Sequence, residues 1–420
     1  MRFIHIADVH LDTAFAGRSE EVRSRLREAA REALARCVDT AVSEKVHAVL
    51  IAGDLFDGPR LSFGSEGLLL RQLAVLAEAG IQVIYATGNH DPGSGPSVQD
   101  LAWPANVTVI AGAEPVTVTI ANRQGDPVGT VTGAGHATAR ETADLASRLR
   151  PPTATSLPRV ALLHTQVTSA SGSELHQAYA PSNLDTLRGA GFDYWALGHV
   201  HQRQVLSADP PVHYPGNLQG RNPRETGPKG GLLVDLHDAA HPVVEFREFT
   251  PVRWERLALA GLENARTLEA LVERVVDAWD EARSADPGSD ATEWVVTVDL
   301  SGPSPAWRKL REREELDALE RECADCLGAL SVRIRADGTH AVVRLADHID
   351  RQDALGASLR LCGRVAAGDD RLGLEEADFA GFDQERHGSL EAYLRRLLDG
   401  ADAEIMARML TGATTESGSP

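Results

Sequence analysis

The sequence predicts an α/β fold: a two-sheet sandwich flanked by helices, then a smaller α+β domain and a helical C-terminal segment. In the first half, short runs dense in Val, Ile and Leu alternate with helical patterns, as in βαβ units. From residue 107 the pattern becomes β-rich, and near residue 250 it changes again. We therefore expect domains at 1–250, 251–345 and 346–410, with a disordered polar tail at 411–420.

Five apolar runs in the first half predict strands. They barely alternate between apolar and polar residues, which is typical of strands buried on both faces. Ser19 is a suitable N-cap for a helix over 20–46, and a second helix is expected over 65–78. The five runs are Phe3–Ala7, Ala48–Ala52, Gln82–Ala86, Val160–Leu163 and Tyr194–Leu197.

Shorter β patterns follow. Strands are expected at 107–110, 116–120 and 129–132, and we expect strands near 212 and at 232–236 and 243–249 to complete a second sheet. The second domain has a β-α-β-α-β-β pattern, with segments at 254–259, 267–285, 293–300, 307–327, 331–335 and 341–345. The last predicted helix spans 389–410.

Each of the five apolar runs leads directly to polar residues that can bind metal ions. Such residues lie at the carboxyl ends of strands, where open α/β sheets place their sites. Glycines precede three of the motif residues and would let the backbone turn sharply. The motifs are Asp8-Val-His10, Gly53-Asp54-Leu-Phe-Asp57, Gly88-Asn89-His90-Asp91, His164 and Gly198-His199-Val-His201.

The ligand chemistry of this set is two carboxylates, one amide oxygen and four imidazoles, without a thiolate. Oxygen ligands suit Mn or Mg, whereas imidazoles suit Zn, Fe or Ni. A carboxylate can bridge two ions about 3.5–4 Å apart, and a hydroxide between the ions can then attack phosphorus in line. Each piece alone is weak: a single His after a strand is usually a core or loop residue. His5, His136 and His213 are expected to be of that kind.

The ordered set resembles the calcineurin-like metallophosphoesterases, and within them the SbcD/Mre-type DNA repair exonucleases of bacteria. The opening FIHIADVHLDTAF and the later segment Tyr214-Pro-Gly-Asn-Leu-Gln-Gly220 are both similar to one bacterial branch of that family. The resemblance covers residues 1 to about 250 and is thin afterwards. It implies a two-metal phosphodiesterase that acts on DNA as an exonuclease, with endonuclease activity as a further expectation.

The resemblance also implies roles for individual residues. The expected ligands of the first metal are Asp8, His10 and His201; those of the second are Asn89, His164 and His199; and Asp54 bridges the two. His90 would stay off the metals and stabilise the transition state or protonate the leaving oxygen. Asp57 would orient His90. Two Mn²⁺ ions are the favoured cofactor, with Mg, Fe or Zn as alternatives.

Composition limits the other possibilities. The net charge of −19 argues against a generally basic nucleic-acid binder, although a local basic cluster can still meet phosphates. The candidates for such contacts are Arg60, Arg203, Arg221, Arg224 and Lys229, and the alternative is that they are ordinary solvated side chains. With no apolar run of about 18 residues and a strand at the N-terminus, we expect no membrane span and a cytoplasmic protein.

Two features concern cysteines and partners. Cys323 and Cys326 have CxxC spacing in a helical pattern, where packing is favoured over a zinc site. The final predicted helix carries an apolar stripe that would either pack on the chain's own body or dock a partner. The resemblance implies an SbcC-like coiled-coil ATPase as that partner and a homodimer through the catalytic domain.

Three functional hypotheses follow. The first is a DNA exonuclease. The second is a small-molecule or nucleotide phosphoesterase with the same dinuclear site, which the acidic net charge favours. The third is a non-catalytic scaffold on this fold, which is disfavoured because such proteins usually lack ligands that are all present here.

Overall fold

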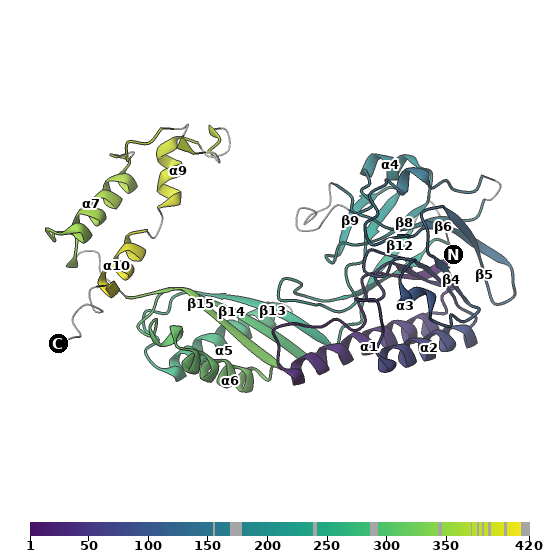
Figure 1. Ribbon diagram of the computed structural model, residues 1–420, viewed down its shortest axis with the longest axis horizontal. Coiled ribbons are helices and arrows are strands. Elements are labelled where there is room, and N and C mark those ends of the chain that lie inside the picture. Colours follow the sequence, from purple (N-terminus) through teal and green to yellow (C-terminus); the bar gives the residue numbers. More distant parts are fainter. Residues whose placement is uncertain are drawn as a thin grey trace. The chain divides into compact units, whose positions relative to one another are not determined.

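The structure is a computed structural model, and it describes residues 1–153, 156–168, 179–237, 242–285, 293–342, 347–370, 372–375, 378–379, 382–384, 388–398 and 401–412. The chain divides into two compact units (Figure 1). The first comprises Met1–Glu255 and Pro287–Val295, and the second comprises Arg256–Asp286 and Val296–Pro420. The domain boundaries inferred from the sequence, at 250, 345 and 410, stay predictions.

The first sheet of the first unit has the order β12-β11-β1-β2-β3-β4. Strands β1 to β4 are parallel, β11 runs antiparallel to β1, and β12 runs antiparallel to β11. The strands are β1 (Arg2–Ile6), β2 (Ala48–Ala52), β3 (Gln82–Ala86), β4 (Val107–Ile110), β11 (Gly230–Asp235) and β12 (Val243–Glu248).

The second sheet has the order β5-β6-β7-β8-β10-β9. Its four central strands are parallel, and the two edge strands β5 and β9 run antiparallel to their neighbours. The strands are β5 (Val116–Ala121), β6 (Pro127–Ala134), β7 (Arg159–His164), β8 (Tyr194–Gly198), β9 (Gln204–Ala208) and β10 (Pro211–Tyr214). The predicted two-sheet α/β sandwich is therefore confirmed.

Three apolar cores hold the layers together. One lies between the two sheets and includes Phe3, Leu50 and Leu162. Another joins the outer face of the first sheet to α1 (Glu20–Ser43) and α2 (Phe63–Glu78), and a third covers the outer face of the second sheet with α4 (Leu184–Gly189). Because successive side chains of a strand point to opposite faces, strands between two cores need apolar residues at nearly every position.

Helix ends follow local chemistry. The Ser19 hydroxyl accepts a hydrogen bond from the backbone N–H of Val22, as expected of the N-cap of α1. The helix ends at Ser43, earlier than predicted, and Lys45 takes a left-handed φ of 52°. Helix α2 begins at Phe63 rather than 65, because Ser62 caps it and is itself held by Asp12.

One sequence-based assignment was wrong. The segments at 107–110, 232–236 and 243–249 form β4, β11 and β12, which belong to the first sheet and not to the second. In β11, Leu233 faces the helix-covered core and Leu232 faces the core between the sheets. Beside β1, this strand contributes apolar side chains to both cores. Its local sequence pattern does not indicate which strand it pairs with.

The second unit contains α5 (Leu268–Ala285) and α6 (Arg313–Leu327), which pack on each other. Strands β13 (Val252–Leu259), β14 (Glu293–Pro303) and β15 (Ser331–His340) form a three-stranded sheet. On α6, Cys323 is buried and Cys326 is exposed, and both are free thiols. Within the described residues, no helix is long and apolar enough to cross a membrane.

Three further predictions in this unit need correction. The strand expected at 331–335 is longer, since β15 continues to His340. Of the strand expected at 341–345, residues 341 and 342 are not in a strand, and residues 343–345 lie outside the described residues. Only 313–327 of the expected helix at 307–327 forms α6, after a short 3₁₀ turn. The final helix is two, α9 (Leu390–Leu397) and α10 (Ala401–Gly412), since the backbone leaves the helical conformation at Leu398. Of the expected tail, residues 413–420 lie outside the described residues.

Candidate metal centre

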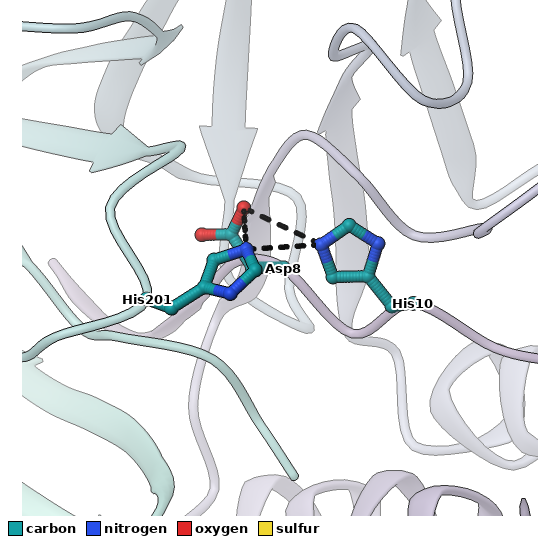
Figure 2. Close-up of side chains that lie close together, drawn as sticks. All are labelled: Asp8, His10 and His201. Carbon is teal, nitrogen blue, oxygen red and sulfur yellow. Dashed lines mark hydrogen bonds and ion pairs between the residues drawn. The ribbon is translucent and has the colours of Figure 1, made fainter. Parts of the chain in front are cut away.

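Asp8, His10 and His201 converge on one point from loops that follow β1 and β8. Figure 2 shows the three side chains pointing toward one another. His10 Nε2 lies 3.2 Å from His201 Nε2, and Asp8 Oδ1 lies 4.0 Å from His10 Nε2 and 3.8 Å from His201 Nε2. Asp8 and His10 are fully buried, so these three atoms face one another rather than solvent.

A second cluster forms beside the first. Asn89 Oδ1 lies 3.0 Å from His164 Nε2 and 3.2 Å from His199 Nδ1, and the two imidazole nitrogens are 3.2 Å apart. Asp54 Oδ2 lies between the clusters, 3.5 Å from His164 Nε2 and 3.7 Å from His10 Nε2. The other carboxylate oxygen of Asp54 accepts the His90 backbone N–H at 2.9 Å, which leaves Oδ2 directed at both clusters.

The backbone brings these residues together by joining loops of the first sheet. The Asp8 N–H donates to Gly53 O, and the His10 N–H donates to Asp54 O at 3.0 Å. Asp8, His10 and Asp54 all take left-handed φ values near 50°. Non-glycine residues in that region are strained and concentrate at functional sites.

The glycines of the motifs serve more than one purpose. Gly53 has a φ of 84°, as expected for a sharp turn. Gly88 and Gly198 do not have positive φ values, so the turning role predicted for them is wrong. A Cβ at Gly198 would overlap the Ala52 carbonyl, and a Cβ at Gly88 would overlap Asp54. Close packing of the ligand loops therefore requires glycine at these two positions.

Acceptors behind two of the imidazoles fix which ring nitrogen faces the cluster, and a carboxylate lies close to a third. His164 Nδ1 donates to Ala52 O at 2.9 Å, and His201 Nδ1 donates to Glu225 Oε1 at 2.9 Å. His10 Nδ1 lies 3.1 Å from Asp57 Oδ1. A ring that donates through Nδ1 presents an unprotonated Nε2, which is the form that binds a metal ion.

The donor set fits two divalent cations. Burial raises the pKa of the Asp8 and Asp54 carboxyls, because an isolated charge is poorly solvated there. Burial also keeps the pKa of His10 and His164 well below the usual value, so these rings are neutral and have free lone pairs. Bound cations would supply the positive charge that stabilises the two ionised carboxylates.

His90 and Asp57 lie next to the first cluster. His90 Nδ1 is 3.2 Å from Asp57 Oδ1, and the His90 side chain is 39% exposed. Asp57 therefore contacts both His10 and His90 through one oxygen. Their ligand atoms are close enough together that these three residues could also hold a metal ion. The hydrogen bond that His90 donates to Asp57 raises the pKa of His90, which favours the protonated ring.

Sequence reasoning missed two carboxylates that hold the ligand loops. Asp91 accepts hydrogen bonds from the backbone N–H groups of Gly88, Asp54, Leu55 and Phe56, and so joins the loops after β2 and β3. Glu225 holds His201, as described above. The available signals were the acid at the end of Gly88-Asn-His-Asp91 and the acid in the loop before β11. Neither pattern predicts which groups the carboxylate contacts.

The five basic residues that were predicted to contact phosphates differ in their exposure and in their distance from the metal centre. Arg60 and Arg224 are exposed, and the exposed Arg203 stacks on the Phe246 ring at 3.9 Å. Arg221 lies at the metal centre, with Nη2 2.5 Å from Asp57 Oδ1. Lys229 is buried, and its Nζ donates to His201 O at 3.2 Å, so its ammonium group is engaged with the loop that carries His201.

The chain is similar to known proteins over this region. Residues 1–203 match the calcineurin-like phosphoesterase family. An uncharacterized metallophosphoesterase of Bacillus subtilis, YhaO, is 36% identical over 311 residues, 73% of each chain. The DNA double-strand break repair protein Mre11 of Aeropyrum pernix is 30% identical, covering 58% of this chain, and the SbcD component of the Escherichia coli nuclease SbcCD is 28% identical, covering 52%.

With two six-stranded sheets and a paired cluster of metal-binding side chains at their shared end, the protein has the fold and site of a dinuclear metallophosphoesterase, a class of hydrolases. The chain belongs to the calcineurin-like phosphoesterase family. It spans 60% of the length of each of the two nucleases named above.

Proposed function

We propose that this chain is a metal-dependent phosphodiesterase that acts on DNA, as an exonuclease with endonuclease activity in DNA repair. The observation that carries the proposal is the position of Asp54 Oδ2 between two ligand clusters, with His90 beside them. The similarity to SbcD and Mre11 supports DNA as the substrate.

The proposed chemistry divides between metals and side chains. Two divalent ions, which we propose to be Mn²⁺, would activate water and neutralise charge on the phosphate. Asp8, His10 and His201 would hold one ion and Asn89, His164 and His199 the other, with Asp54 as the bridge. His90, oriented by Asp57 and protonated, is placed to donate a proton to the leaving oxygen.

Purified protein incubated with linear duplex DNA and Mn²⁺ tests the proposal. Wild type should shorten the DNA. His90→Gln should keep its metals and lose about 10²-fold or more in rate, since a general acid contributes that much. Asp54→Asn should lose both metals and activity. The proposal fails if wild type does not cut DNA, or if both variants cut as fast as wild type.

A small-molecule phosphoesterase is the second candidate. The net charge of −19 and the burial of Lys229 favour it, because both reduce the positive surface available to DNA. Hydrolysis of bis-p-nitrophenyl phosphate without cleavage of any DNA substrate would establish this function in place of the first.

We also propose a homodimer and an SbcC-like coiled-coil ATPase as partners, with the ATPase bound by the C-terminal segment. The name of the Escherichia coli relative, a component of nuclease SbcCD, supports the ATPase. Leu397 on α9 is 54% exposed and available for docking. Leu397→Glu should abolish co-elution with such an ATPase in size-exclusion chromatography; unchanged co-elution would remove α9 from the docking surface.

A further inference from the structure

Glu225 is a partly buried carboxylate, 12% exposed, that accepts hydrogen bonds from four donors at once. These are His201 Nδ1 at 2.9 Å, Asn217 Nδ2 at 2.6 Å, Asn222 Nδ2 at 2.6 Å and the Arg221 backbone N–H at 2.7 Å. All four contacts come from N–H donors, which is the arrangement that an ionised carboxylate accepts. The residue is therefore a fixed negative charge to which both a ligand and a neighbouring loop are tied.

The loop tied to Glu225 carries Arg221 into the metal centre. Arg221 Nη2 lies 2.5 Å from Asp57 Oδ1, and Nη1 lies 3.1 Å from His10 Nε2. The side chain is only 19% exposed, and its Nε is buried. The guanidinium thus lies beside the first ligand cluster rather than on the outer surface.

We propose that Glu225 is a positioning residue that fixes the metal ligand His201 and also places Arg221 to contact the scissile phosphate. The inference rests on the proposed phosphodiesterase function, but it does not require that the substrate be DNA.

The two Nη atoms of Arg221 have different partners. Asp57 uses Nη2, whereas Nη1 points at the lone pair of His10 Nε2. If His10 binds a cation, this lone pair is used by the cation and no longer accepts a hydrogen bond from Nη1. The Nη1 hydrogens are then available to another acceptor beside the cation. A phosphate oxygen is the acceptor expected there, because guanidinium groups bind phosphate through several N–H donors.

The position also separates Arg221 from the other arginines. Arg60, Arg203 and Arg224 are exposed, whereas the Arg221 side chain is only 19% exposed. Arg221 is held at the cluster from both sides, by Asp57 through its side chain and by Glu225 through its backbone. A contact with the reacting phosphate matters for every ester, however short, whereas a flanking contact matters only for DNA.

Arg221→Ala and Arg221→Lys test the phosphate contact. With both substrates, bis-p-nitrophenyl phosphate and duplex DNA, Arg221→Ala should lose about tenfold or more in kcat/KM, as expected for a lost hydrogen bond to a charged group. Calorimetry with inorganic phosphate on the Mn²⁺-loaded protein should show a similar loss of affinity. Arg221→Lys should recover part of both losses. Arg36→Ala, on the exposed face of α1, is the matched control and should behave as wild type.

Glu225→Gln tests the positioning role, and it is preferred to Glu225→Ala because it keeps the size of a partly buried side chain. Its affinity for Mn²⁺ by calorimetry should fall about tenfold to a hundredfold at one of two sites, since acceptors behind ligating histidines have effects of that size. Phosphate affinity should fall as well. Thermal unfolding without metal reports whether the variant folds, and Glu78→Gln, at the exposed end of α2, is the control.

The two variants have distinct expected results. Arg221→Ala should bind Mn²⁺ like wild type, whereas Glu225→Gln should not. Loss of DNA cleavage alone by Arg221→Ala, with bis-p-nitrophenyl phosphate turnover and phosphate affinity unchanged, would assign Arg221 to the flanking backbone and overturn the inference. So would wild-type Mn²⁺ affinity in folded Glu225→Gln. If no form of the protein cuts DNA, the proposed substrate fails, while the phosphate and ester measurements still decide this inference.

Discussion

Asp91 shows how a single buried carboxylate organises the metal centre without touching a metal. Its two oxygens accept four backbone N–H groups, from Gly88 at 2.7 Å, Leu55 at 2.5 Å, and Asp54 and Phe56 at 3.2 Å each. These groups belong to the loops that present Asp54, the proposed bridge, and Asn89, a proposed ligand. The placement of both depends on this side chain.

Asp91→Ala should lower the free energy of unfolding of the metal-free protein by about 3 kcal/mol or more. The reason is that buried N–H groups left without an acceptor cost about 1–3 kcal/mol each. Urea unfolding measures the difference. Asp39→Ala, on the exposed face of α1, is the control and should change stability by less than about 0.5 kcal/mol. A loss at Asp91 as small as that of the control would contradict this account.

His5 should make the metal-free protein sensitive to acid. It is buried and neutral, with Nε2–H donating to Leu197 O at 3.1 Å and Nδ1 accepting from the Tyr194 hydroxyl at 3.1 Å. Burial, with a contribution from His213, lowers the pKa of His5 to about 3. The unfolded chain binds this proton near pH 6.5, so stability contributed by neutral His5 is complete above pH 6.5 and falls as the pH falls toward 3.

The slope is measurable. Within this window the loss should be about 1.4 kcal/mol per pH unit for one proton. Urea unfolding of metal-free wild type and His5→Leu at several pH values from about 7 to about 4 checks it: the variant should be less stable at neutral pH but show a shallower slope. Parallel curves for the two proteins would show that His5 does not take up the proton.

The leucines along helix α9 differ in their exposure. Leu390 and Leu394 are buried in a small cluster with Val365 of α7 (Ala354–Ala367), whereas Leu397 is exposed. The stripe expected from the sequence therefore packs partly on the chain itself. The remaining exposed leucine is the part left for a partner.

This division predicts different effects of two similar substitutions. Leu394→Ala should destabilise the α7–α9 cluster by about 2–3 kcal/mol, because it removes buried methyl groups and leaves a cavity. Leu397→Ala should change it by less than about 0.5 kcal/mol. Hydrogen–deuterium exchange of peptides from 354–367 and 390–397 measures the local effect. Equal protection in both variants would show that Leu394 does not hold the cluster together.

Metal ions should stabilise the first unit as a whole, because their ligands come from loops of both sheets. Free metal at about a hundredfold excess over its dissociation constant adds about 2.7 kcal/mol. Calorimetric melting with Mn²⁺ and after EDTA treatment should show a higher melting temperature with Mn²⁺. Asp54→Asn, which lacks the bridging carboxylate, should lose this response; a metal-independent melting temperature in wild type would contradict the site.

The convergence of the candidate ligands was predictable, because the motifs that carry them follow buried strands. Asp8 after β1, Asp54 after β2 and His164 at the end of β7 stand where short apolar runs stop, and strands of both sheets end at the same place. The sheet membership of β11 was not predictable, since a strand between two cores has the same apolar pattern beside any neighbour.

The sequence by itself determined the α/β class, the main strands, and the residue types that converge on a dinuclear site, because apolar runs and ligand motifs are local patterns. Only the tertiary structure decided that Lys229 is buried beneath His201, that Asp91 and Glu225 hold the ligand loops, and that Arg221 lies at the cluster. These facts depend on contacts between residues far apart in the chain, where hydrogen-bond geometry and burial are set by the fold and not by neighbours in sequence.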